Sequence, residues 1–290
     1  MAKTKVAGKA SGKKVSAVDQ ELMELFKQTG ELAAKQTIIT ESGTYIQIIS
    51  DPESDILTPG KPTYIKGAKY KGFVIPSKSI SLGASFSAVI TGIFPVFEQY
   101  VFESDDPKDM GKIVGYWHPD DTLGFQKSGW FDRMFFDKNG KRNLLKQIYW
   151  VYFYLPDYPE IEEARLTMRG NVCKKAKELE KLVGKSLVRL SQAKFTVSTV
   201  VRKIEEYRTT AIDPDFTVDE NIYDVKDGRV IPVDDVEVVK EVLTAELAVR
   251  KKYDEGSMIR RRDDATMIEG HSNANTRLIT ADDDDDELTF

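Results

Sequence analysis

The sequence predicts a mainly β protein in which antiparallel strands form a barrel, with a few appended helices and disordered ends. The strongest periodic segments are β-branched and aromatic runs bounded by Gly, Pro and Asp. Few helical patterns lie between these runs, which argues against a parallel sheet wound with helices. The 290 residues, 41% hydrophobic and 31% charged, are typical of a soluble globular protein with charged appendages.

The chain is expected to begin with a disordered basic arm. Residues 1–15 combine five lysines with small residues and no acid, so they cannot bury a core. A helix follows that Ser16 can cap, and its apolar face carries Val18, Leu22, Leu25 and Phe26. Gly30 marks the end of this helix.

The barrel domain is expected to span residues 16–210. Its predicted strands are 36–50, 63–76, 85–104, 111–119, 144–156, 163–170 and 195–208. Gly92 and Pro95 indicate a bend or bulge in the third. A Gly-, Asp- and aromatic-rich loop is expected over 119–141, and a helix at about 171–183 before the last strand. This arrangement fits a partly open five-stranded barrel of the OB type with extra strands attached.

After Thr210 the composition becomes acidic. Residues 211–255 are expected to form an acidic segment with a helix at about 235–253, whose inward face carries Val236, Val239, Leu243 and Leu247. Residues 256–290 are expected to be a disordered linker and acidic tail.

Charge divides the chain into a cationic body and an anionic C-terminal region. The stretch from Gly60 to Thr210 holds 25 Lys and Arg against 17 Asp and Glu, whereas residues 211–290 hold 10 against 22. Such a division indicates two partners of opposite charge. The alternative is an uneven spread of charge over a solvated surface.

Several classes of protein are disfavoured. A single cysteine, Cys173, permits no intrachain disulfide, and with only two histidines the chain cannot form a usual structural zinc site. The run "VGKS" at 183–186 lacks the glycine and the preceding strand of a phosphate-binding loop. No signal peptide or membrane-length apolar run is present, so a cytoplasmic location is expected. We expect no cofactor and no enzyme activity.

Residues 144–156 predict a strand with two different bulky faces. Tyr149, Val151 and Phe153 suit the barrel interior, because side chains alternate along a strand. The opposite face, with Lys146, Trp150, Tyr152 and Tyr154, is then expected to point outward.

An outward row of aromatic rings beside cations is typical of a surface for single-stranded nucleic acid, since bases stack on rings and phosphates meet cations. The preceding strand and the loop 119–141 supply more residues of both kinds. The predicted nucleic-acid-binding residues are Lys146, Trp150, Tyr152, Tyr154, Tyr116, Trp117, Lys127, Trp130, Phe131, Arg133, Lys141 and Arg142. The alternative is that these rings pack a lid and Trp150 contacts a covering helix.

Five lysines of the helix at about 171–183 and the residues after it leave a similar choice open. They either extend this surface as phosphate contacts or lie on a solvated helix face. They are Lys174, Lys175, Lys177, Lys181 and Lys185.

The chain ends with "DDDDDELTF", an acidic run followed by an aromatic residue. A barrel of this type with such a tail resembles the single-stranded DNA-binding proteins of bacteria and tailed phages. The resemblance implies a docking peptide for replication, recombination and repair proteins such as a polymerase, helicase, primase or nuclease. The matching residues are Asp282, Asp283, Asp284, Asp285, Asp286, Glu287 and Phe290. The tip Leu288-Thr289 replaces the family's apolar-Pro pair, which leaves the partner's identity open.

The sequence is compatible with three functions. The first is a non-catalytic protein that coats single-stranded DNA and recruits partners through its tail. The second is a phage structural or assembly protein with a solubilising tail and no specific nucleic-acid binding. The third is a nuclease or annealing enzyme that uses acids at Asp105–Asp109 or Asp120–Asp121 with Mg²⁺, for which no motif places a third carboxylate. A homo-oligomer is compatible with each of these functions.

Overall fold

The computed structural model describes residues 20–22, 24–25, 44–119, 132–136, 142–204 and 209–254. The predicted basic arm over 1–15 and the linker and tail over 256–290 lie outside them. Within these residues no helix is long and apolar enough to cross a membrane.

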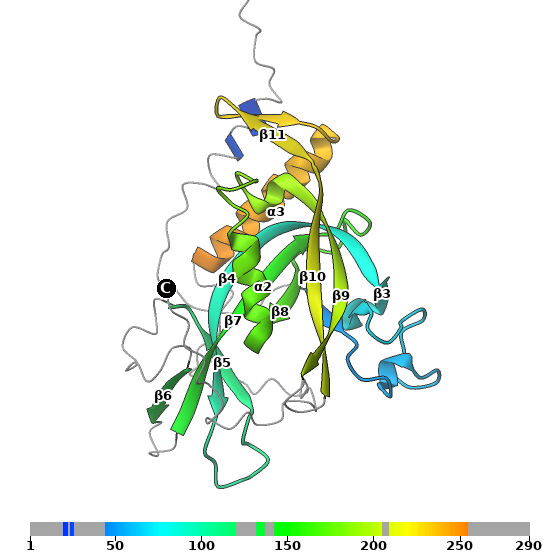
Figure 1. Ribbon diagram of the computed structural model, residues 1–290, viewed down its shortest axis with the longest axis vertical. Coiled ribbons are helices and arrows are strands. Elements are labelled where there is room, and N and C mark those ends of the chain that lie inside the picture. Colours follow the sequence, from blue (N-terminus) through cyan, green and yellow to red (C-terminus); the bar gives the residue numbers. More distant parts are fainter. Residues whose placement is uncertain are drawn as a thin grey trace, which may run out of the picture.

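The protein is mainly β, as predicted, and ten of its strands form one curled sheet (Figure 1). The strands of this sheet are β1 (Thr44–Ile48), β2 (Phe73–Ile75), β3 (Ile80–Gly83), β4 (Ser85–Val101), β5 (Ile113–Trp117), β6 (Asp132–Phe136), β7 (Arg142–Tyr154), β8 (Ala164–Met168), β9 (Ala193–Ile204) and β10 (Thr209–Asn221). A separate hairpin comprises β11 (Tyr223–Lys226) and β12 (Arg229–Pro232), and the named α-helices are α2 (Cys173–Glu180) and α3 (Val236–Asp254).

The centre of the sheet is a Greek key. Strands β9, β4, β7 and β8 lie side by side in that order, and all three pairs are antiparallel. This is the fourth-first-second-third order of a Greek key, with β10 as a fifth strand beside β9. The helix α2 lies in the long connection from β8 to β9, so the arrangement agrees with the OB-like barrel that the sequence predicted.

The sheet is not antiparallel throughout. The N-terminal strand β1 pairs with β8 in parallel, and β2 and β3 continue the sheet beyond it. The strands added to the Greek key therefore come from the chain before β4 as well as from its own connections.

Strand β4 is irregular near Gly92, as predicted, and it pairs with different strands along its two edges. Residues 85–89 pair with β9 and residues 89–101 pair with β7, with a register shift between Ile90 and Gly92. A Cβ on Gly92 would lie 2.5 Å from a ring carbon of Phe94, so any other residue would have to displace that buried ring. Pro95 is tolerated because β9 reaches β4 only as far as Val89 and β5 only from Phe97, which leaves its edge unpaired there.

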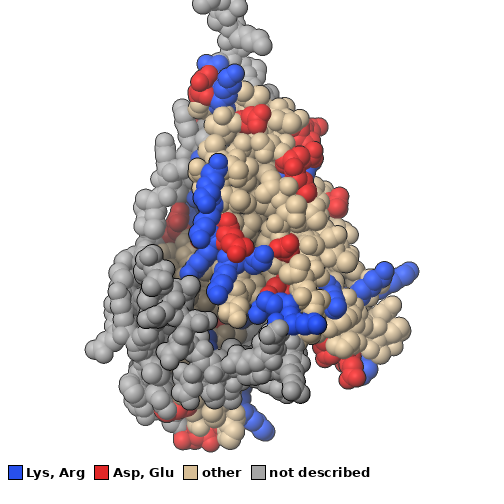
Figure 2. Space-filling model, viewed as in Figure 1, with Lys and Arg blue, Asp and Glu red and all other residues tan. Residues whose placement is uncertain are grey.

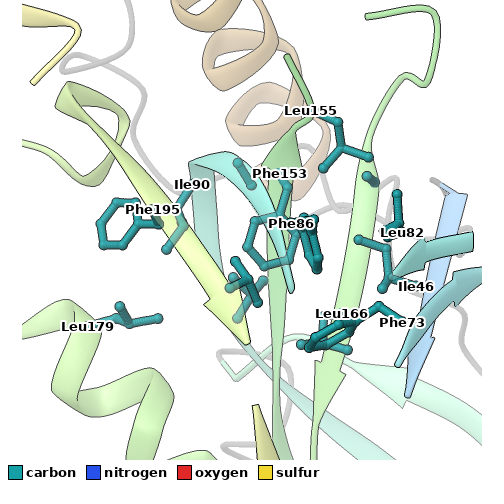
Figure 3. Packing of buried hydrophobic residues seen from close by; sticks show 14 of the residues in the cluster. Ile46, Phe73, Leu82, Phe86, Ile90, Phe153, Leu155, Leu166, Leu179 and Phe195 are labelled. Carbon is teal, nitrogen blue, oxygen red and sulfur yellow. The ribbon is translucent and has the colours of Figure 1, made fainter. Parts of the chain in front are cut away.

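The main core lies on the concave side of the curled sheet (Figure 3). Tyr149, Val151 and Phe153 of β7 belong to it, as the alternation of the strand predicted. Helix α2 covers this side with Ala176 and Leu179, which are both buried.

A second core fixes α3 and the N-terminal helical residues. Val239, Val242 and Leu243 of α3 pack with Leu22 and Val89. The predicted helix therefore forms, with Val239 and Leu243 facing inward, and the backbone N–H of Glu237 donates to Asp235 Oδ1 at 2.8 Å.

Three expectations were wrong. Residues 63–72 form turns instead of a strand, and β6 lies within the segment expected to be a loop. The chain beyond Thr210 does not leave the sheet, because β10 pairs with β9 from Thr209 to Asn221. The predicted barrel boundary at residue 210 therefore falls inside a strand of the sheet.

Candidate nucleic-acid interface

The β4–β7 pair extends past the Greek key as an arm of four strands. Strand β5 lies beside β4 at Phe97 to Tyr100, and β6 lies beside β7 at Arg142 to Lys146. The arm therefore has the order β5-β4-β7-β6, and the described ends of segment 120–131 lie on opposite edges of the β4–β7 pair.

Several of the predicted binding residues cannot be placed. Lys127, Trp130, Phe131, Lys141 and the whole acidic tail lie outside the described residues. Arg133 and Arg142 are placed by their backbone only, and in the β6–β7 pair Arg133 lies opposite Leu145 and Arg142 opposite Phe136.

The outward aromatic face of β7 is not an exposed platform. Trp150 and Tyr152 are fully buried, and Tyr116 is 5% exposed. The C-terminal half of α3 covers them with Val249 and Tyr253. The expectation of exposed rings here is corrected: the amphipathic α3 needs an apolar surface to pack against, and this face supplies it.

Tyr253 is the residue that fastens α3 to this face. Its ring stacks on Phe94 with 4.3 Å between the centroids, and its hydroxyl donates to the carbonyl oxygen of Pro95 at 2.7 Å. His118, at the end of β5, lies 4.7 Å from the same ring.

Trp150 lies in the cluster that the C-terminal half of α3 covers. The Tyr116 ring meets its edge at 5.1 Å, and the Arg165 guanidinium lies 4.4 Å from its centroid. Within the described residues its indole Nε1 has no hydrogen-bond partner. Trp150 therefore contributes packing and a cation–π contact inside the protein.

A charged cluster fixes the outer face of the arm. Arg169 donates to both carboxylate oxygens of Glu98, at 2.9 and 2.7 Å, and Tyr100 donates to the same carboxylate. Burial and the Glu98 charge raise the pKa of Tyr100 above its usual range. Burial opposes the charge on Arg169, but the bonds to Glu98 outweigh it and raise the pKa of the guanidinium.

Three predicted residues keep partial exposure. Lys146 lies opposite Glu98 in the register of the arm, and Trp117 donates from Nε1 to Gln99 Oε1 at 2.9 Å. Tyr154 donates to Glu241 of α3, and burial together with that bond raises its pKa. Lys146 and Trp117 thus remain as described candidates for contact with a ligand, both on the arm.

The sequence reasoning missed two arginines of this face. Arg165 and Thr167 of β8 lie opposite Tyr152 and Trp150 of β7, and Arg169 follows one residue after the end of β8. The alternation Arg-x-Thr-x-Arg was visible in the sequence, and pairing of the strand with β7 would have placed both cations beside the aromatic row.

The lysines of α2 are divided between the two alternatives. Lys175 pairs with Asp215 at 2.9 Å, which also raises its pKa, and so it belongs to the fold. Lys174, Lys181 and Lys185 are exposed, and basic side chains gather over α2 in Figure 2. They stay candidates for phosphate contacts.

Potential metal ligands and the one thiol were located among the described residues. No group of three or more His, Cys, Asp or Glu side chains gathers among them in a way that could hold a metal ion. Burial raises the pKa of the Cys173 thiol to about 11, and the thiol lies 3.3 Å from the carbonyl oxygen of Met168. Cys173 therefore has the surroundings of a structural residue.

Comparison with known proteins gives no relative. The chain matches no protein-family model, no curated protein and no solved structure. A functional conclusion must therefore come from the strand order, the residues of the faces and the charge of the chain.

Proposed function

We propose that this protein binds single-stranded DNA without catalysing a reaction and recruits replication or recombination proteins through its acidic tail. The observation that carries the proposal is the Greek-key order β9-β4-β7-β8 with β10 beside β9. Barrels with this order bind oligonucleotides on the face of their second and third strands and with the loops that follow the first and fourth.

The loop after the first Greek-key strand supports the proposal. In this chain it is the connection from β4 to β7, residues 102–141, which includes β5 and β6. That connection carries a concentration of rings and cations in the sequence, including Lys127, Trp130, Phe131 and Arg133. Stacking on such rings is worth about 1–3 kcal/mol per base.

The arm continues β7, the second Greek-key strand, past its pairing with β8. Binding is centred on Lys146, on Trp117 at the opposite face of the arm, and on the chain between β5 and β6, instead of on Trp150 and Tyr152. Phosphate contacts make the affinity fall steeply with salt.

The tail provides the second half of the function. Its acidic run, Asp282–Glu287, is drawn to a basic partner and Phe290 fills a pocket there. Deletion of residues 282–290 is expected to leave DNA binding intact or tighter and to abolish capture of a polymerase, helicase, primase or nuclease. Loss of DNA binding in the deletion would contradict this division of labour.

The test is a titration of tryptophan fluorescence with poly-dT at two salt concentrations, with duplex DNA as the comparison. Quenching is expected with poly-dT, with weaker binding at higher salt and little response to duplex. Trp117→Phe should reduce the quenching, while buried Trp150 gives a constant background. Absence of any preference for single strands would end the proposal and favour the assembly protein.

A charge variant localises the binding. Lys146→Gln should weaken poly-dT binding, whereas Lys226→Gln in the β11–β12 hairpin removes the same charge far from the arm and should have no effect. Equal effects of the two variants would show that only the net charge matters.

A further inference from the structure

The chain between β1 and β2 forms a compact lobe at the edge of the sheet, residues 49–72 (Figure 1, right). It has a small core of its own, made of Ile49, Ile56 and Ile65 with Val74 of β2. None of the predicted binding residues lies on this lobe, where the sequence predicts a strand over 63–76.

The lobe is held in place at both ends and against the sheet. Lys71 N–H donates to the Ile49 carbonyl and Ile49 N–H to the Gly72 carbonyl, each at 2.9 Å. The Thr199 hydroxyl of β9 donates to the carbonyl oxygen of Lys71 at 2.8 Å. The side chains of the lobe are therefore presented from a fixed backbone.

Positive charge is concentrated in the second half of this lobe and beside it, because the lobe's three carboxylates, Asp51, Glu53 and Asp55, all lie in its first half. No Asp or Glu occurs from Gly60 to Gly83. Lys61 pairs with Asp55 at 3.4 Å, but in the described part of the chain four further lysines form no ion pair, namely Lys66, Lys69, Lys71 and Lys78. Figure 2 shows basic side chains projecting at this edge of the molecule.

Two exposed aromatic rings lie among these lysines. Tyr64 is 37% exposed and Tyr70 is 39% exposed. Lys71 Nζ lies 5.3 Å from the centre of the Tyr70 ring. A base that stacked on Tyr70 would therefore have a cation within reach of its phosphate.

We propose that this lobe is a second contact surface for single-stranded DNA, with bases stacked on Tyr64 and Tyr70 and phosphates bound by Lys66, Lys69, Lys71 and Lys78. The inference rests on the proposed function and enlarges its site. Interleaved rings and unpaired lysines match a strand of alternating bases and phosphates. The acidic tail of this chain is a poorer match, because its acidic run carries no ring and only Phe290 follows.

Strand β9 supplies a route from the lobe toward α2. Beyond Thr199, which bonds the lobe, Lys203 is exposed and forms no ion pair within the described residues. Basic side chains over the lower end of β9 and over α2 continue across the face shown in Figure 2. A long strand can follow these cations away from the lobe, so the lobe matters most for long ligands.

The test compares two triple variants of the full chain. Lys66→Gln, Lys69→Gln and Lys78→Gln remove three charges from the lobe region, and Lys226→Gln, Arg229→Gln and Lys251→Gln remove three from exposed sites elsewhere. The lobe variant should bind a 40-nucleotide dT strand about tenfold or more weaker, with a salt slope smaller by about 2, since each phosphate contact on a single strand contributes about 0.7. The control variant should match the wild type, and thermal unfolding should be unchanged in both.

A second pair of variants tests stacking. Tyr64→Leu with Tyr70→Leu should weaken binding, and Tyr64→Phe with Tyr70→Phe should restore it, because phenylalanine keeps the ring. If the wild type binds dT but the lobe variants bind as the control does, the lobe inference is wrong and the proposed function stands. If the wild type does not bind dT, both fail. If the lysine variant leaves dT binding intact but makes the acidic tail more sensitive to protease, the lobe binds the tail instead of DNA. That result would overturn the proposed DNA contact surface.

Discussion

The outer face of β7 and the lobe between β1 and β2 both combine aromatic rings with cations, but only the lobe presents them to solvent. On β7, Trp150 and Tyr152 are fully buried beneath α3, with Arg165 lying over the Trp150 ring. On the lobe, Tyr64 and Tyr70 remain exposed beside unpaired lysines. The same pair of residue types therefore builds a core in one region and a surface in the other.

The two regions differ in exposure because α3 covers one of them and no described helix covers the other. Helix α3 carries an apolar stripe and needs an apolar surface, which the β7 face supplies. The apolar residues Ile49, Ile56 and Ile65 of the lobe pack with Val74 in a core of their own. The tyrosines and lysines of the lobe therefore remain exposed to solvent or to a ligand.

The largest expected effect is a loss of stability when a ring of the core, and not one of the surface, is removed. Trp150→Ala should lower the free energy of unfolding by about 3–5 kcal/mol, because it removes a large side chain from a packed core. Urea denaturation measures this loss, and Tyr70→Leu, on the exposed lobe, should change stability little. A Trp150→Ala protein of unchanged stability that binds DNA weakly would restore the β7 face as the platform.

A substitution in the small core of the lobe tests whether DNA binding needs the folded lobe. Ile65 is 2% exposed in the small core, so Ile65→Ala should cost about 2–4 kcal/mol of local stability. The lobe should then be cut faster by protease, and dT affinity should fall to that of the lysine variant. Unchanged DNA affinity in a protein with an opened lobe would contradict the proposed contact surface.

High pH should lower the free energy of unfolding, because buried tyrosine hydroxyls resist ionisation. Burial raises the pKa of Tyr149 to about 12, and burial likewise raises that of Tyr223 well above 10. In the folded protein both hydroxyls stay protonated to a higher pH than in the unfolded chain, where tyrosine ionises near pH 10. Their contribution to the free energy of unfolding is therefore fully present below pH 10 and is lost as the pH rises above it. The loss should approach about 1.4 kcal/mol per pH unit for each. Urea midpoints between pH 9 and 11 measure it, and a flat profile would contradict the burial of these hydroxyls.

The sequence predicted most strands because their alternation is a local property. It predicted the inward face of β7 from Tyr149, Val151 and Phe153, and the bend at Gly92. It missed β10 because Pro214 and nearby acids disfavour a strand, whereas the structure places Pro214 in a strand at the edge of the sheet. It missed the lobe because "TYIKGAKYKG" resembles a strand until Gly67 and Lys71 take positive φ values of 83° and 66°.

The candidate site was less predictable because its exposure depends on contacts between distant segments. Nothing in residues 144–156 indicates that Tyr253, about a hundred positions later, will cover them. Local alternation divides a strand into two faces, but only the tertiary partner decides which face meets water. The tail residues Asp282–Glu287 and Phe290 stay a prediction.

The smallest effect tests whether α3 is a fixed cover. Tyr253→Phe keeps the ring on Phe94 but removes the hydrogen bond to the Pro95 carbonyl oxygen, and should cost about 1 kcal/mol. Hydrogen exchange should become faster in the last turn of α3 and stay unchanged near Val239, which packs in the other core. Because the lobe and the arm do not depend on this bond, dT affinity should not change. A rise in affinity would mean that DNA competes with α3 for Trp150 and Tyr152, and the buried face would then be the binding surface in the open form.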